Sequence, residues 1–168
     1  MNLHITLFSI AAISSILASP PVLGAPRATV EVRYVQSVKF TDFNIYGRGS
    51  QWSGSYFATQ ISDDLRPLLE RRVPGGKLTL RFTDIDLAGH YPSRGGSSVR
   101  VVRGAIRPGR MSFEFVLLDS SGRTLASGST RITDTSSPSS LAHHPKRSQA
   151  LYYEKRMLER WLRSIKIS

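Results

Sequence analysis

Alternating apolar and polar positions predict the first strands of this chain, because successive side chains of a strand point to opposite faces. Residues 29–35 read TVEVRYV, with valine or tyrosine at positions 30, 32 and 34. Residues 77–87 read KLTLRFTDIDL and begin with the same alternation. Their apolar positions change phase after Phe82, so that Ile85 and Leu87 continue the pattern with the opposite parity. A phase change of this kind predicts either a β-bulge or the end of the strand near Thr83.

The most regular pattern predicts a β-hairpin over residues 110–133. Residues 110–118 read RMSFEFVLL, with an apolar side chain at every second position, and the returning strand carries Leu125 and Ile132. The DSSG sequence at residues 119–122 is typical of the turn between two such runs. A further short edge strand is expected over residues 99–103, which read VRVVR.

Apolar residues at helical spacing predict two amphipathic helices. The first covers residues 54–73, and its Pro67 predicts a bend near residues 63–66, because an interior proline costs a helix about 3 kcal/mol. The second covers residues 149–165, with Ser148 as its N-cap. Residues 37–53 are rich in Gly, Ser and aromatic residues without a clean period, and they are expected to form a long connection.

These elements together predict an α+β fold. Two amphipathic helices need an apolar surface to cover, and one face of a largely antiparallel sheet offers it. We therefore expect a sheet of four to five strands with both helices on one face, in the order β-α-β-(β)-β-β-α. The chain has 168 residues, of which 40% are hydrophobic and 21% charged. That composition suits a single folded domain, which we place at residues 25–168.

The N-terminal residues have the pattern of a signal peptide. Residues 5–17 are mostly apolar. This run is shorter than the ~20 residues of a membrane span and suits the apolar core of a signal peptide. Pro20 and Pro21 then end any helix, so we expect residues 1–24 to be removed near Gly24 and the mature protein to be periplasmic or secreted, without a membrane span. Because residues 1–4 contain no Lys or Arg, a retained membrane anchor stays open as an alternative.

The chain is strongly basic, which indicates the charge of its partner. It has 23 Lys and Arg against 12 Asp and Glu, a formal net charge of +11. In the cytosol such a charge would indicate a nucleic-acid partner. An exported protein instead meets anionic lipids, acidic polymers and acidic proteins, so we expect an acidic envelope protein or an anionic envelope component and no nucleic acid. The absence of cysteine excludes disulfides, thiol nucleophiles and thiolate zinc sites.

Four stretches of sequence resemble a known family when taken together. Residues 38–43 read VKFTDF, residues 83–89 read TDIDLAG, residues 99–119 read VRVVRGAIRPGRMSFEFVLLD, and residues 153–162 read YEKRMLERWL. They resemble a family of bacterial exported proteins known as domain of unknown function 3016, over nearly the whole mature chain. The resemblance implies an envelope location and supplies no catalytic residues.

An arginine-rich segment is the candidate binding site. Five arginines occur between positions 94 and 110 without an intervening acid: Arg94, Arg100, Arg103, Arg107 and Arg110. The guanidinium fork matches phosphate and carboxylate groups, so these residues are candidates for binding an anion or an acidic partner. The alternative is a solvated face, or internal pairing with Asp84, Asp86 and Asp119.

Asp84 and Asp86 are the candidate acidic pair. Residues two apart on a strand share a face and lie roughly 6.5–7 Å apart, which suits weak binding of a divalent cation or, less well, acid–base chemistry. The simpler interpretation is that they end the strand and pair with nearby arginines. His143 and His144 are adjacent and point opposite ways in an extended chain, which disfavours chelation, and His90 is more typical of a loop residue than of a base.

No common catalytic pattern occurs in the sequence: G-x-S-x-G, H-E-x-x-H, the P-loop and the dinucleotide glycine fingerprint are all absent. The leading hypothesis is therefore a non-enzymatic accessory or binding protein that needs no cofactor. A small-molecule or divalent-metal binding module using Asp84 and Asp86 stays open, as does a periplasmic hydrolase.

Overall fold

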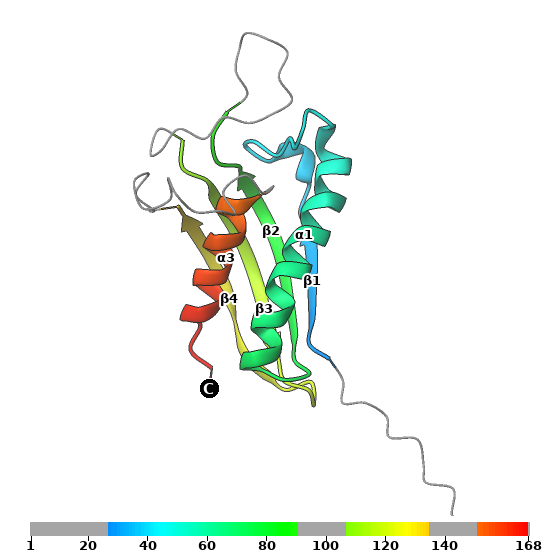
Figure 1. The fold of residues 1–168 in the computed structure, drawn as a ribbon, viewed down its shortest axis with the longest axis vertical. Helices are drawn as coiled ribbons and strands as arrows, with labels where there is room; N and C mark the ends of the chain where they lie inside the picture. The colour runs from blue at the N-terminus through cyan, green and yellow to red at the C-terminus, as the bar shows by residue number, and fades with distance from the viewer. Residues whose placement is uncertain (1–26, 91–106, 135–150, 168) are drawn as a thin grey trace, which may run out of the picture.

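The computed structural model describes residues 27–90, 107–134 and 151–167 (Figure 1). Within them the chain forms four strands, two α-helices and one short 3-10 helix. In chain order these are β1 (Thr29–Tyr34), η1 (Ser37–Lys39), α1 (Gly49–Arg72), β2 (Lys77–Asp86), β3 (Arg110–Leu118), β4 (Thr124–Thr133) and α3 (Tyr152–Ser164).

The four strands form one mixed sheet in the order β1-β2-β3-β4. β1 pairs with β2 in parallel, while β2–β3 and β3–β4 are antiparallel. The parallel pair follows from connectivity, because α1 carries the chain from the end of β1 back to the start of β2. The predicted α+β class is confirmed, and the predicted strand at residues 99–103 lies outside the described residues.

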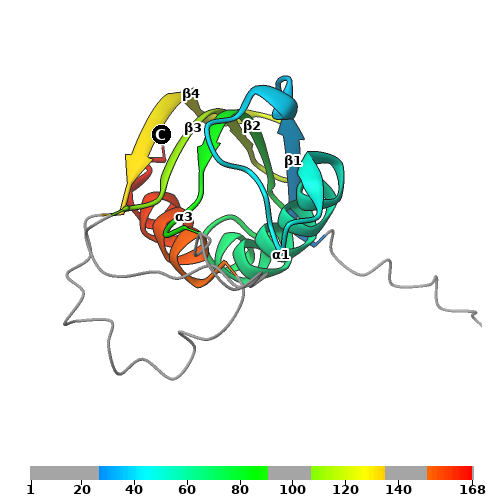
Figure 2. The same ribbon diagram turned by 90° about the horizontal axis from the view of Figure 1, so that it is seen from above.

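Both helices cover the same face of the curved sheet (Figure 2). The inward side chains of β2 are Leu78, Leu80 and Phe82, and then Ile85, all fully buried. The pairing of β2 with β3 shifts register between Phe82 and Asp84, so the change of phase marks a bulge and not the end of the strand. From α3, the ring of Trp161 packs edge-on against Phe113, with 4.7 Å between ring centroids.

The helix boundaries differ from those predicted. α1 begins at Gly49, so the predicted connection over residues 37–53 holds the first turn of α1 as well as η1. Two contacts support the extra turn: the buried Ser53 hydroxyl accepts the N–H of Ile45 from outside the helix at 2.9 Å, and within the helix Trp52 stacks on Tyr56 with 5.0 Å between centroids. Pro67 does not split the helix, which continues to Arg72.

The last helix is shorter than predicted. α3 begins at Tyr152, and its N-cap residue, Leu151, has a φ of 58° in the left-handed region. The predicted cap, Ser148, lies outside the described residues. In the part of the chain that the structure describes, no helix combines the length and apolar character needed to cross a bilayer.

Candidate functional site

No described helix covers the face of the sheet opposite α1 and α3 (Figure 2). This face is mainly polar. Its side chains are those that alternate with the buried positions of each strand, so they point away from the core. They include Glu31 and Arg33 of β1, Lys77, Thr79, Arg81 and Thr83 of β2, Ser112, Glu114 and Val116 of β3, and Ser127, Ser129 and Arg131 of β4. We refer to this surface as the open face.

Glu31 and Glu114 of the open face are held in ion pairs, whereas Asp84 and Asp86, which follow the β2 bulge on the same face, lie opposite Ser112 and Arg110. Glu31 pairs with Arg33 at 2.6 Å and with Lys77 at 3.2 Å, and hydrogen bonds from these two cations lower its pKa. On the neighbouring strands, Arg81 Nη1 lies 2.6 Å from Glu114 Oε2. Exposed pairs of this kind stabilise a fold by only about 0–1 kcal/mol each. Their main effect here is to neutralise the carboxylates of Glu31 and Glu114.

Two arginines of the open face have no such partner. The register places Arg110 opposite Thr133 and Arg131 opposite Ser112, so the two arginines are diagonal neighbours on β3 and β4. Within the described residues, neither Arg110 nor Arg131 forms an ion pair, and the same holds for Arg107, which precedes β3. At this end of the open face, these arginines form no ion pair with a described acid, and Asp86 lies opposite Arg110 and Asp84 opposite Ser112 on the neighbouring strand.

A hollow of about 380 Å³ opens on the open face beside the β2 bulge. Its lining comes from β2, β3 and β4 and comprises Thr83, Ser112, Phe113, Glu114, Ser129, Thr130 and Arg131. The bulge turns Thr83 toward β3, where its hydroxyl donates to the carbonyl of Ser112 at 3.1 Å. The hollow thus brings together hydroxyl groups, one carboxylate and one guanidinium.

Residues 28–164 match the family model described as protein of unknown function, DUF3016. The chain belongs to the DUF3016 family. The resemblance noted in the sequence is thereby confirmed. No curated protein matches the chain.

Of the five arginines predicted for this DUF3016 protein, two fall within the described residues. Arg107 and Arg110 lie at the end of the open face where β3 begins, and the Arg107 carbonyl accepts the N–H of Gly89 at 3.0 Å. Arg94, Arg100 and Arg103 lie outside the described residues, as do His143 and His144. The structure therefore places the described part of the predicted arginine segment at the same end of the open face as Arg131. Arg131 forms no ion pair with a described acid and was not predicted from the sequence.

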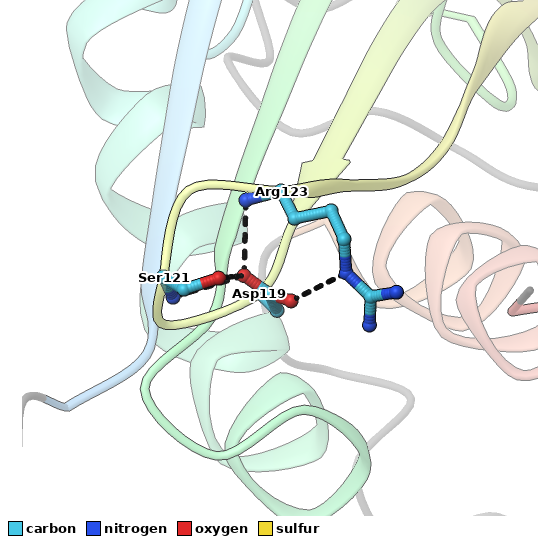
Figure 3. A network of polar contacts seen from close by, with 3 residues as sticks. All are labelled: Asp119, Ser121 and Arg123. Carbon is cyan, nitrogen blue, oxygen red and sulfur yellow. Dashed lines mark hydrogen bonds and ion pairs between the residues drawn. The ribbon is translucent and has the colours of Figure 1, made fainter.

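Asp119 does not pair with Arg107 or Arg110, the described members of that segment. It sits in the β3–β4 turn, where Oδ1 accepts the Ser121 hydroxyl at 2.6 Å and Oδ2 accepts Arg123 Nε at 3.1 Å (Figure 3). These hydrogen bonds, with Ser121 first and Arg123 second, hold the pKa of Asp119 well below its usual value. Asp119 therefore fixes the turn through local partners.

Both carboxylate oxygens of Asp84 accept hydrogen bonds within the fold of this DUF3016 protein. Its Oδ1 accepts the backbone N–H of Thr41 at 2.8 Å, and its Oδ2 accepts the Thr41 hydroxyl at 2.9 Å. Next to it, Asp42 forms a parallel bridge with Asp86. Among the described residues, no three His, Asp or Glu side chains come together as metal ligands. The geometry therefore favours a role for Asp84 in holding residues 41–42 against the end of β2.

Proposed function

We propose that this DUF3016 protein is an exported, non-enzymatic binding protein whose basic surface engages an anionic component of the envelope or an acidic protein. The observation that supports the proposal is that Arg107, Arg110 and Arg131, near one end of the open face, form no ion pair with a described acid. Within the described residues, no helix covers this face (Figure 2).

The acids of the chain are used mostly within the fold, which supports the proposal. Besides the pairs of the open face, Asp63 pairs with Arg66 at 3.0 Å and Asp134 pairs with Arg160 at 3.0 Å. Glu154 accepts a backbone N–H instead, from Ala88. Since 23 basic residues face only 12 acidic ones, the excess charge is left for interactions outside the fold. Such a field attracts anionic surfaces and is screened by salt.

The test is salt-dependent binding to two defined anionic probes, anionic phospholipid vesicles and immobilised polyglutamate. We expect the wild-type protein to bind at low salt and to be released as the ionic strength rises. Replacing Arg107, Arg110 and Arg131 together by Ala should lower the salt concentration of release. The matched control replaces Lys39, Arg71 and Lys166 by Ala, which removes the same charge elsewhere.

The control variant should retain most of the binding if the open face is the contact surface. Equal losses in the two triple variants would mean that only net charge matters, and the assignment to the open face would be wrong. Failure of the wild-type protein to bind either probe at low salt would overturn the proposed function itself. Vesicle binding alone would favour an anionic envelope component, and polyglutamate binding alone would favour an acidic protein.

A further inference from the structure

We infer that the hollow beside the β2 bulge binds an acidic sugar, that is, one saccharide ring carrying a carboxylate or a phosphate group. The inference rests on the proposed function and names a ligand class for part of the open face. The hollow of about 380 Å³ lies near the lower end of the volumes of small-molecule sites, about 300–1,000 Å³. It therefore suits a single ring.

Arg131 supplies the contact for the acidic group. Arg131 lines the hollow, and its guanidinium forms no ion pair with a described acid. A guanidinium fork binds a carboxylate or a phosphate through two parallel hydrogen bonds, so it fixes the orientation of the ligand as well as its charge. Arg110, the diagonal neighbour of Arg131, adds positive charge on the same side without lining the hollow.

Glu114 and the hydroxyl groups supply the contacts for the ring. Arg81 Nη1 donates a hydrogen bond to Oε2 of Glu114 at 2.6 Å, and among the described residues no group donates to Oε1. That oxygen can accept a hydrogen bond from a sugar hydroxyl. Ser112 and Ser129 add hydroxyl groups that both donate and accept. The register sets Ser112 opposite Arg131 and Glu114 opposite Ser129, so the four side chains form two adjacent cross-strand pairs.

Other ligand classes match this lining less well. A bare phosphate ion would leave the Glu114 carboxylate without a donor and would be repelled by it. A metal ion would find one carboxylate. An apolar ligand would find no apolar side chain, because Phe113 is turned into the core and is 1% exposed. An acidic sugar uses the guanidinium, the carboxylate and the hydroxyl groups together, since it carries one anionic group and several hydroxyls.

The experiment is a titration of the folded protein with four probes: glucuronic acid, glucose 6-phosphate, glucose and inorganic phosphate. Binding is followed by calorimetry and by amide chemical shifts in NMR spectra. We expect at least one acidic sugar to bind about tenfold or more tightly than glucose and phosphate, and to shift the amides of residues 112–114 and 129–131. Preference for glucuronic acid would indicate a uronate-containing polymer, and preference for glucose 6-phosphate a phosphorylated glycolipid.

Variants test the assigned contacts. Arg131→Ala should weaken binding of the acidic sugar about tenfold, and Glu114→Gln should weaken it while strengthening phosphate binding, because the repulsion by the carboxylate is removed. Arg123→Ala is the charge-matched control, because Arg123 lies in the hairpin turn outside the hollow. The inference is overturned if neither acidic sugar binds, if phosphate binds as tightly, or if Arg131→Ala and Arg123→Ala behave alike. In each of these cases the salt-dependent binding to vesicles or polyglutamate can persist. The proposed function is therefore tested independently of this inference.

Discussion

Glu154 of α3 accepts a hydrogen bond from the backbone N–H of Ala88, with 2.9 Å between Oε1 and the nitrogen. Its side chain is 4% exposed, which is unusual for a glutamate. The contact joins the last helix to the segment that leaves β2, 66 residues earlier in the chain. Glu154 lies in the YEKRMLERWL stretch that resembles the family, and this structural role gives a physical reason for a glutamate at that position.

Glu154→Ala should destabilise the protein by about 1–3 kcal/mol, because it removes the carboxylate that accepts the buried N–H of Ala88. Glu154→Gln keeps an acceptor oxygen and should cost less. The control is Glu31→Ala, which removes an exposed ion-paired carboxylate and should cost at most about 1 kcal/mol. Chemical denaturation of the three variants measures these differences. Equal losses for Glu154→Ala and Glu31→Ala would contradict the assigned contact.

Arg72 holds the C-terminal end of α3 against α1. Its guanidinium donates to the carbonyl of Leu162 and, at 2.9 Å through Nη2, to the carbonyl of Ile165. Hydrogen bonds from a charged donor contribute about 1.5–3 kcal/mol each, so Arg72→Ala should destabilise the protein by roughly that amount or more. Hydrogen exchange should become faster in α3 first. Arg71→Ala, at the exposed neighbouring position, is the control and should leave exchange in α3 unchanged.

Glu159 of α3 should make the protein less stable as the pH rises, whereas most carboxylates make a protein more stable. Its partial burial raises its pKa above the reference value of 4.5, and the charge and hydrogen bonding of Asp64 on α1 raise it further, against the lowering effect of Arg163 and Arg156. A raised folded-state pKa stabilises the protein at low pH, and this contribution is lost as the pH rises from the unfolded-state value through the folded-state value.

The measurement is the free energy of unfolding of wild type and Glu159→Gln from pH 4 to pH 8. The variant should gain stability relative to wild type as the pH rises, because the wild-type carboxyl then ionises beside Asp64. Glu31→Gln should behave in the opposite way, since the pKa of Glu31 is lowered. A difference between wild type and Glu159→Gln that does not change with pH would refute the coupling.

The strands could be predicted well because a strand with one buried face has alternating apolar and polar residues, a pattern that can be recognised in the sequence alone. The change of phase after Phe82 predicted a bulge or a strand end, and the pairing of β2 with β3 on both sides of the irregularity decides for the bulge. The parallel pairing of β1 with β2 could not be predicted, since it depends on residues about 48 positions apart, such as Val30 opposite Leu78. The first turn of α1 was missed for the same reason: the Ser53–Ile45 contact that stabilises it has no periodic signal.

The candidate site could be predicted only in part. Clustering along the chain identified Arg107 and Arg110, but Arg131 is separated from them by the hairpin. Its position beside Ser112 follows from the register of β3 and β4, which the sequence leaves open by one or two residues. The turn at residues 119–122 offered a signal in the sequence. Pairing the two strands residue by residue outward from this turn shows which outward-facing positions of β3 and β4 lie opposite one another. Asp84 was assigned a possible metal role because Thr41, its actual partner, lies 43 residues away.

Export is the prediction on which the envelope setting of the proposed function depends. The apolar run at residues 5–17 should direct the chain out of the cytosol, and cleavage near Gly24 should follow. Expression of the full chain in a bacterial host, fractionation and N-terminal sequencing measure both steps, and the product should begin at Ala25 or within a few residues of it. Replacing Leu7 and Ile10 by Asp should abolish export by disrupting the apolar run. A full-length product that accumulates in the cytosol would remove the envelope setting, and the net charge of +11 would then point toward nucleic acid.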